Sequence, residues 1–342
     1  MTALAFAAQS PRVAARPSAA IWLLTLVMLV IFAGIRANEV GADTQVYVSR
    51  YEFLQSQLQI WDVRGSAEIG VKAVYAVALA LQFEVTGFLV VVSAIVVACY
   101  FHSIIRYSAN PALSLFLLIA LGFFLFHMNG LRQGLAAAVF ILAVPQLLRG
   151  KFWHYALLCL LAGTFHVSAL VMIPLYFVFR RGVSPLTVGS MIIACTLITF
   201  FPEDVFRFAG LLNERYETYA ERNETGATLL TAFFVLSSVG LAAVRSFVLA
   251  AVWPDYDKLL AMVILGTLIY LTVTMAGLYV EITRMAIYPL QALIFIWPLL
   301  IMSQTNSKNQ AFFLIVSVIS GLVFYIAFIS QIGGYIPYAA RL

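Results

Sequence analysis

Long apolar runs recur along most of the chain, and they limit its fold more than any other feature. A helix needs about 20 consecutive apolar residues to cross a bilayer. The apolar runs of this chain lie at 19–35, 86–104, 112–127, 131–148, 185–201, 227–248, 259–280, 285–302 and 311–330. Only 10% of the 342 residues are charged, against about 25% in soluble domains, which excludes a soluble enzyme. We predict an all-α polytopic integral membrane protein, a single domain over 1–342 with about 10–11 transmembrane helices.

Two further segments do not read as simple crossings. The run 153–179 is interrupted at 163–166 and has basic residues on both flanks. It forms either a hairpin of two short helices with His166 at the tip, or one tilted helix. The segment 68–83 is apolar but short and carries Lys72, so we predict a re-entrant or interfacial helix there.

The distribution of basic residues predicts an orientation. Short connections rich in lysine and arginine are usually cytoplasmic, and the first apolar run is too long for a cleaved signal peptide. Residues 1–18 are therefore expected to form a short cytoplasmic tail, with long outer loops at 36–67 and 202–226. No basic run of the kind that binds nucleic acid occurs, so nucleic acid is not an expected partner. The three cysteines lie inside apolar runs without metal-site spacing.

Most polar residues that the apolar runs do not explain fall on the predicted outer side. Ionisable residues at membrane depth are costly, so they are functional-site candidates by default. Some recur at helical spacing, such as 43, 47 and 50, or 129, 132 and 133. The full set is Arg36, Asp43, Thr44, Tyr47, Glu68, Asn129, Arg132, Gln133, His166, Arg215, Tyr216, Tyr219, Glu281, Arg284 and Tyr288.

Several of these residues fall into ordered motifs. The motifs are Arg36-x4-Gly41-Ala42-Asp43-Thr44-x2-Tyr47, Leu131-Arg132-Gln133-Gly134-Leu135-Ala136, Arg149-Gly150-Lys151, Phe165-His166-Val167-Ser168-Ala169-Leu170, Arg215-Tyr216-x2-Tyr219 and Arg284-x3-Tyr288. In this order the motifs resemble the EpsG family of exopolysaccharide proteins, which is similar to the Wzy-type polymerases of capsule and O-antigen synthesis. The resemblance extends over roughly residues 30–300. The basic turn at 149–151 is often richer in lysine in the family.

The resemblance implies transfer of a glycan from a polyprenyl-diphosphate carrier on the outer face of the bacterial plasma (inner) membrane. Arginine suits the diphosphate because its fork binds phosphate oxygens bidentately, and an acceptor hydroxyl needs a base nearby. The implied partners are the polyprenyl-diphosphate-linked glycan, membrane lipids, and a flippase and chain-length regulator of the pathway. No cofactor or metal is expected. The residues assigned to substrate binding are Arg36, Arg132, Gln133, Arg215, Arg284 and Tyr288, and those assigned to catalysis are Asp43, His166 and Glu281.

Other interpretations stay open from the sequence. A transporter or flippase of the same lipid-linked glycan would show internal repeats and broken helices, and no clear repeat is present. A non-catalytic scaffold of the polysaccharide machinery and a membrane O-acyltransferase are further alternatives. Single residues also have structural interpretations: Asp43 and Thr44 as a helix N-cap, Arg284 as an ion-pair partner of Glu281, and Arg132 as an interfacial anchor.

Overall fold

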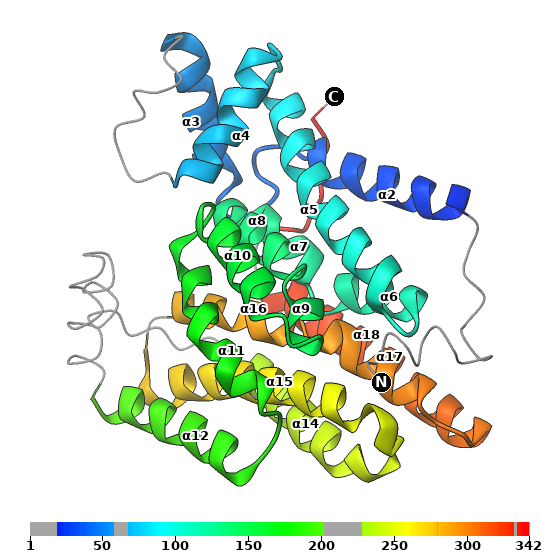
Figure 1. Ribbon diagram of the computed structural model, residues 1–342. Helices are drawn as coiled ribbons and strands as arrows, with labels where there is room; N and C mark the ends of the chain where they lie inside the picture. The colour runs from blue at the N-terminus through cyan, green and yellow to red at the C-terminus, as the bar shows by residue number, and fades with distance from the viewer. Residues whose placement is uncertain (1–18, 58–67, 202–227, 279, 332–333, 342) are drawn as a thin grey trace.

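The computed structural model describes residues 19–57, 68–201, 228–278, 280–331 and 334–341, and within these ranges the chain is helical (Figure 1). The described ranges contain no strand and one isolated bridge, between Arg36 and Ala340. Among the described residues, seven helical stretches are long and apolar enough to cross a membrane, and five apolar helices are shorter. The predicted class, an all-α polytopic membrane protein, is confirmed.

The first half of the chain contains most of the short helices. The helix α2 packs along α5, and α5 packs on α8. The bounds are α2 Ala19–Gly34, α3 Thr44–Gln57, α4 Ile69–Ala80, α5 Val85–Tyr107, α6 Pro111–Ala120, α7 Phe123–Asn129, α8 Leu131–Phe140, α9 Val144–Leu148, α10 Phe152–Gly163, η1 Val167–Val171 and α11 Met172–Arg180.

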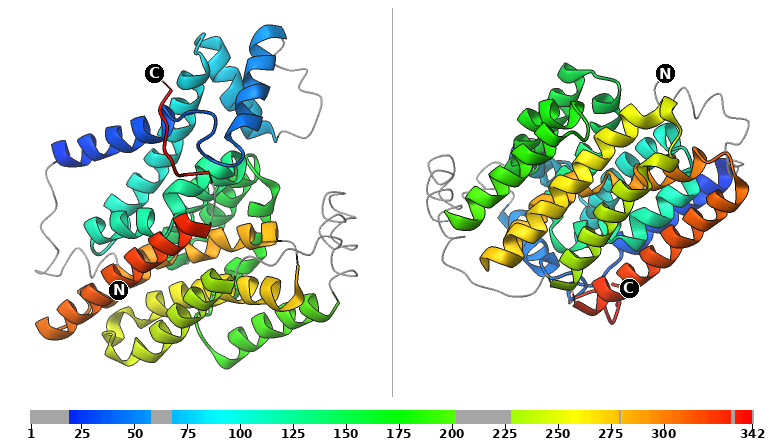
Figure 2. Two further views of the ribbon diagram at one scale, coloured as in Figure 1. Left: turned by 180° about the vertical axis from the view of Figure 1, so that it is seen from behind. Right: turned by 90° about the horizontal axis from the view of Figure 1, so that it is seen from below.

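The second half contains longer helices. Helices α12, α14 and α15 lie side by side (Figure 2), with α15 in contact with both of the others. The bounds are α12 Pro185–Phe200, α14 Thr228–Ala243, η3 Val244–Phe247, η4 Ala250–Val252, α15 Trp253–Ala276, η5 Val280–Ala286, α16 Ile287–Leu290, α17 Leu293–Met302 and α18 Ser307–Gln331.

Burial separates central helices from those at the lipid boundary. In the stretch 282–302, 89% of the apolar window is buried, against 28% in 228–247 and in 307–330. The latter two stretches expose large apolar side chains such as Leu236 and Ile326. In a bilayer such faces contact lipid tails, whereas a helix that is apolar and buried all round belongs to the centre of the bundle.

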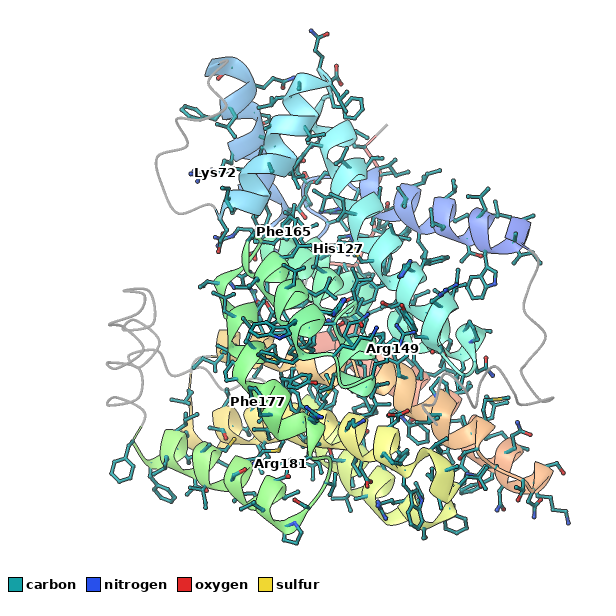
Figure 3. All side chains as sticks on the ribbon, in the orientation of Figure 1. Lys72, His127, Arg149, Phe165, Phe177 and Arg181 are labelled. Carbon is teal, nitrogen blue, oxygen red and sulfur yellow. The ribbon has the colours of Figure 1, made fainter. Side chains whose placement is uncertain are left out.

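The interrupted run is a hairpin. Helix α10 ends at Gly163, the chain turns, and η1 and α11 return along α10. His166 is the residue that precedes η1 at the turn, as the hairpin interpretation predicts. Figure 3 shows Phe165 close to α4, whereas Arg149 and Arg181 lie far from this turn. The two basic flanks of the hairpin thus lie away from its tip.

The predicted long loop at 36–67 contains the helix α3, which begins at Thr44, as the N-cap interpretation of Asp43 and Thr44 allows. The α3 side chains Val48, Tyr51 and Leu54 are buried. Spacing of three residues places them on one face, and the Tyr51 ring stacks on Phe88 of α5 at 4.7 Å. Most other residues of α3 are polar, with Val46 and Phe53 as exposed apolar exceptions, so the segment has no long apolar run. A short helix that does not cross the bilayer was predicted at 68–83. The observed helix α4 agrees with this, because it is separate from α5 and too short to cross. The predicted loop 202–226 lies outside the described residues.

Candidate functional site

A tight turn places Asp43 beside the junction of α7 and α8. The backbone N–H of Ala42 donates to Asn129 Oδ1 at 2.9 Å, and Thr44 Oγ1 donates to the Met128 carbonyl at 3.0 Å. Gly41 has φ +94°, and a Cβ there would lie 2.2 Å from Met128 O. A side chain would clash with the backbone and strain it. The Gly-Ala-Asp-Thr motif therefore docks the start of α3 on this junction.

A second close approach fixes the start of α8. A Cβ added to Gly134 would lie 2.4 Å from Cα of His127 on α7, so only glycine allows the two helices to meet this closely. Arg132 and Gln133 directly precede Gly134 in the first turn of α8. The Arg-Gln-Gly motif therefore combines two polar side chains with the packing residue that positions them.

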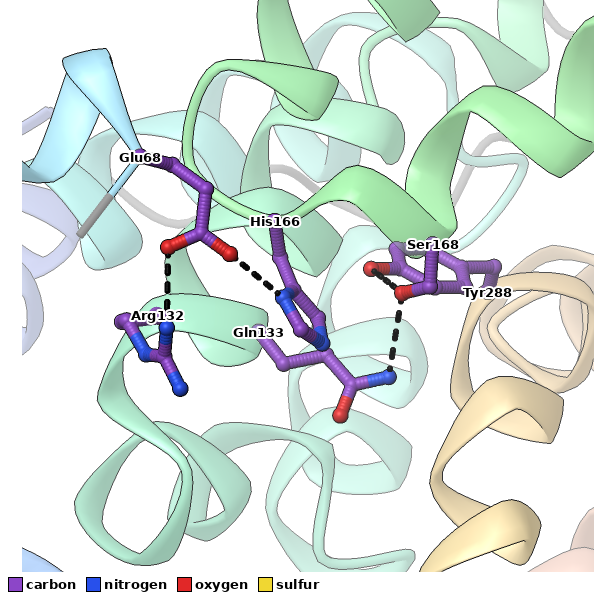
Figure 4. A network of polar contacts seen from close by, with 6 residues as sticks. All are labelled: Glu68, Arg132, Gln133, His166, Ser168 and Tyr288. Carbon is purple, nitrogen blue, oxygen red and sulfur yellow. Dashed lines mark hydrogen bonds and ion pairs between the residues drawn. The ribbon is translucent and has the colours of Figure 1, made fainter. Parts of the chain in front are cut away.

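Glu68 connects two residues that the sequence assigns to the site. Arg132 Nη1 lies 2.9 Å from Glu68 Oε2, and His166 Nδ1 lies 3.1 Å from Glu68 Oε1 (Figure 4). Burial alone would raise the pKa of the Glu68 carboxyl, but the hydrogen bond from His166 and the Arg132 charge outweigh it and lower this pKa to about 2. An ionised carboxylate therefore holds a guanidinium on one oxygen and an imidazole on the other.

A second ion pair joins Asp43, the residue before α3, to Arg284 on η5. Arg284 Nη1 lies 3.4 Å from Asp43 Oδ2, with about a third of each side chain exposed. The Arg284 carbonyl accepts a hydrogen bond from Gln133 Nε2 at 3.1 Å, which ties η5 to the start of α8. The structure thus brings Asp43, Arg132, His166 and Arg284 together from four separate parts of the chain.

Buried polar side chains lie behind the partly exposed groups Asp43, Arg132, His166 and Arg284. Gln133 Nε2 donates to Ser168 Oγ at 3.5 Å, and the hydroxyls of Ser168 and Tyr288 share a hydrogen bond of 2.9 Å. Tyr288 is fully buried and Gln133 nearly so. The prediction that both bind substrate directly does not fit this burial. They lie behind the exposed groups and position α8, η1 and α16 relative to one another.

Arg36 also departs from its predicted role. Its side chain is fully buried, Nε donates to Thr44 Oγ1 at 3.3 Å, and Nη1 donates to the Ala33 carbonyl. A guanidinium enclosed by its own turn holds the entry to α3 and is not accessible to a substrate. Arg215 lies outside the described residues. Glu281 lies on η5, and its side chain is likewise not described.

A cavity of about 290 Å³ opens next to Arg132, between α3, α4 and the start of α8. Burial raises the pKa of the Tyr47 hydroxyl, and a hydrogen bond with Arg132 partly offsets this rise. The cavity is lined by Asp43, Val46, Tyr47, Arg50, Val71, Tyr75 and Arg132. Arg50 and Tyr75 were not among the candidate residues, and Glu68 was a candidate without an assigned role. The available signals were the i+7 spacing of Arg50 from Asp43 and the position of Glu68 at the start of the short apolar segment 68–83.

Two basic residues far from this site, Arg245 and Lys258, have structural partners. Arg245 Nε lies 2.6 Å from Asp257 Oδ1, and Lys258 Nζ donates to the Leu148 carbonyl at 3.0 Å. No group of three potential metal ligands occurs in the part of the chain that the structure describes. The ionisable groups around Arg132, by contrast, face a cavity.

Fold and site together define a polytopic α-helical membrane protein with a charged, partly open site assembled from distant segments. The chain belongs to the EpsG family, because the model of that family matches residues 19–340. Membership indicates a part in exopolysaccharide biosynthesis and agrees with the resemblance noted in the motifs. Searches of curated proteins and of solved structures each found no match.

Proposed function

We propose that the protein polymerises polyprenyl-diphosphate-linked oligosaccharide repeat units on the outer face of the plasma membrane. The observation that carries this proposal is the Glu68 carboxylate held between Arg132 and His166. A phosphate-binding cation and an oriented imidazole on adjacent sides of one carboxylate supply what the reaction needs. The N-terminus is then cytoplasmic, and the flippase and chain-length regulator of the pathway are the expected partners.

The chemistry follows from these groups. An acceptor hydroxyl oxygen forms the new bond to the anomeric carbon of the donor glycan, and the bond from that carbon to the lipid diphosphate breaks. The leaving diphosphate takes the bonding electrons, and Arg132 and Arg284 stabilise its charge. The proton of the acceptor hydroxyl passes to His166 Nε2, while Nδ1 remains bonded to Glu68.

Asp43 has a positioning role in this scheme. Its carboxylate lies 3.4 Å from Arg284 and so fixes the direction of that guanidinium. Both ion pairs stay partly exposed, with side-chain exposures between 15% and 35%. A substrate anion therefore reaches both arginines without the full desolvation cost of a buried charge.

The test uses a strain that lacks the protein and expresses single variants. Arg132→Ala is expected to abolish polymer while single repeat units remain on the lipid carrier at the outer face. Arg181→Ala serves as control, since this exposed arginine lies away from the site. Normal chain length with Arg132→Ala contradicts the proposal. Repeat units trapped on the cytoplasmic side would instead identify the protein as a flippase.

A further inference from the structure

The wall of the cavity beside Arg132 includes Tyr75, whose hydroxyl makes no hydrogen bond within the described structure. Tyr75 is only 1% exposed and lines the cavity, and its buried hydroxyl has no hydrogen-bond partner in the described structure. The ring is fixed because it stacks on Phe88 at 5.0 Å. A buried hydroxyl without a partner costs stability, so its presence on a cavity wall points to a ligand.

The surroundings of this hydroxyl define the charge of that ligand. The charged and ionisable groups that act on Tyr75 are Tyr47, Arg50 and Arg132, and all three line the same cavity. Asp43 is the acidic residue of the lining, and its charge is offset by Arg284 at 3.4 Å. Arg132 is in turn paired with Glu68 at 2.9 Å. The lining therefore presents two guanidinium groups, and these provide two sets of donors suited to phosphate oxygens.

Size narrows the choice further. A volume of about 290 Å³ lies at the lower end of the range of small-molecule sites, about 300–1,000 Å³. It suits a head group and not an oligosaccharide repeat unit. Val46 and Val71 in the lining offer apolar surface beside the charged groups.

We infer that this cavity is the binding site for the diphosphate of a prenyl carrier, an assignment that rests on the proposed function. Arg50 and Arg132 bind the phosphate oxygens, and the Tyr75 hydroxyl donates one hydrogen bond to them. Arg50 and Tyr75 thereby become substrate-binding residues. Arg132 connects the cavity to the predicted catalytic groups, because it lines the cavity and also contacts Glu68, the carboxylate that binds His166.

The chain offers a matched control for Tyr75. Tyr176 on α11 is also fully buried and its hydroxyl likewise has no partner among the described residues. It does not line this cavity, and it packs near Phe152 and Arg180. Removal of either hydroxyl relieves the same desolvation cost, so both phenylalanine variants are expected to fold at least as stably as the parent.

The experiment measures binding of farnesyl diphosphate and of inorganic diphosphate to the purified full chain in phosphatidylcholine nanodiscs, by calorimetry. Tyr75→Phe is expected to weaken farnesyl diphosphate binding about 10-fold to 100-fold, the loss of one hydrogen bond to a charged group, with no fall in unfolding temperature. Arg50→Gln is expected to weaken it at least as much. Tyr176→Phe and Arg181→Gln are expected to bind like the parent protein.

The two probes separate the possible sources of the phosphate. Tyr75-dependent binding of farnesyl diphosphate that is tighter than that of inorganic diphosphate supports a prenyl carrier site. Equal affinities overturn the prenyl assignment, and so does binding that Tyr75→Phe leaves unchanged or that Tyr176→Phe weakens equally. The assay needs no acceptor and no turnover. The cavity assignment can therefore fail while Arg132 remains essential for polymer, or hold while the polymerase proposal fails.

Discussion

Replacing Glu68 with glutamine keeps the size of the side chain and removes the charge that Arg132 and His166 share. The two contacts are 2.9 Å and 3.1 Å, and the side-chain exposures are 15% for Glu68, 28% for Arg132 and 24% for His166. Exposed ion pairs contribute about 0.2–1 kcal/mol, and loss of one partner of a buried pair costs about 3–5 kcal/mol. This partly buried pair lies between these limits, so we expect a loss of about 1–3 kcal/mol.

The pKa of Glu68 leads to a similar magnitude. A carboxyl pKa lowered from 4.5 to about 2 corresponds to roughly 3 kcal/mol at about 1.4 kcal/mol per unit, and solvent screening reduces this figure to about 1–3 kcal/mol. Because the pKa is lower in the folded protein, the stabilisation is fully present above about pH 4.5. It is lost as the pH falls toward 2.

The assay is unfolding of the purified protein in mixed micelles between pH 8 and pH 3, together with polymer length in cells. The difference between parent and Glu68→Gln is expected to be constant from pH 8 to 5 and to shrink below about pH 4.5. Glu84→Gln is the control, because Glu84 is exposed and precedes α5 as Glu68 precedes α4, each without a side-chain cap. A difference below about 0.5 kcal/mol at pH 7, or normal polymer, refutes the reasoning.

Three other substitutions test separate parts of the site. His166→Gln is expected to lower the polymerisation rate about 100-fold or more with unchanged affinity for farnesyl diphosphate, and an equal loss of affinity would exclude a proton-transfer role. Tyr288→Phe is expected to lower the unfolding free energy by about 0.5–1.5 kcal/mol and to preserve polymer, because the Tyr288 hydroxyl supports the site without contacting substrate. Loss of polymer at normal stability would instead show that Tyr288 binds substrate. Gly41→Ala is expected to destabilise the protein by more than about 2 kcal/mol, because of φ +94° and the 2.2 Å approach to Met128 O; a stable, active variant would show that this turn is not required.

The apolar runs were predictable because a bilayer fixes the length and composition of a crossing helix. The runs 86–104, 131–148 and 311–330 correspond to observed helical stretches within a few residues. Helix α3 has no such run. Its buried face is narrow and consists of Thr44, Val48, Tyr51 and Leu54. The sequence therefore indicated it only through the helical spacing of residues 43, 47 and 50 and the N-cap interpretation of Asp43 and Thr44.

The site was partly predictable from its motifs. Asp43, Arg132, His166 and Arg284 converge, although their roles remain predictions. Glu68 received no role because its partners lie 64 and 98 residues away in the chain, and no local spacing reports such a contact. Tyr75 stands among valines and alanines in α4, where a tyrosine resembles an ordinary core residue. Only the three-dimensional arrangement shows that its hydroxyl has no partner.

The Arg-Gln pair at the start of α8 explains why motif residues alone could not separate binding from support. Successive residues on a helix project in different directions, about 100° apart. Arg132 accordingly faces Glu68 and the cavity, whereas Gln133 turns toward Ser168 and the Arg284 carbonyl. A guanidinium in a partly open site binds a substrate anion well only when its orientation is fixed. The buried neighbour that fixes α8 against η1 and η5 is therefore as necessary to this arrangement as the arginine itself.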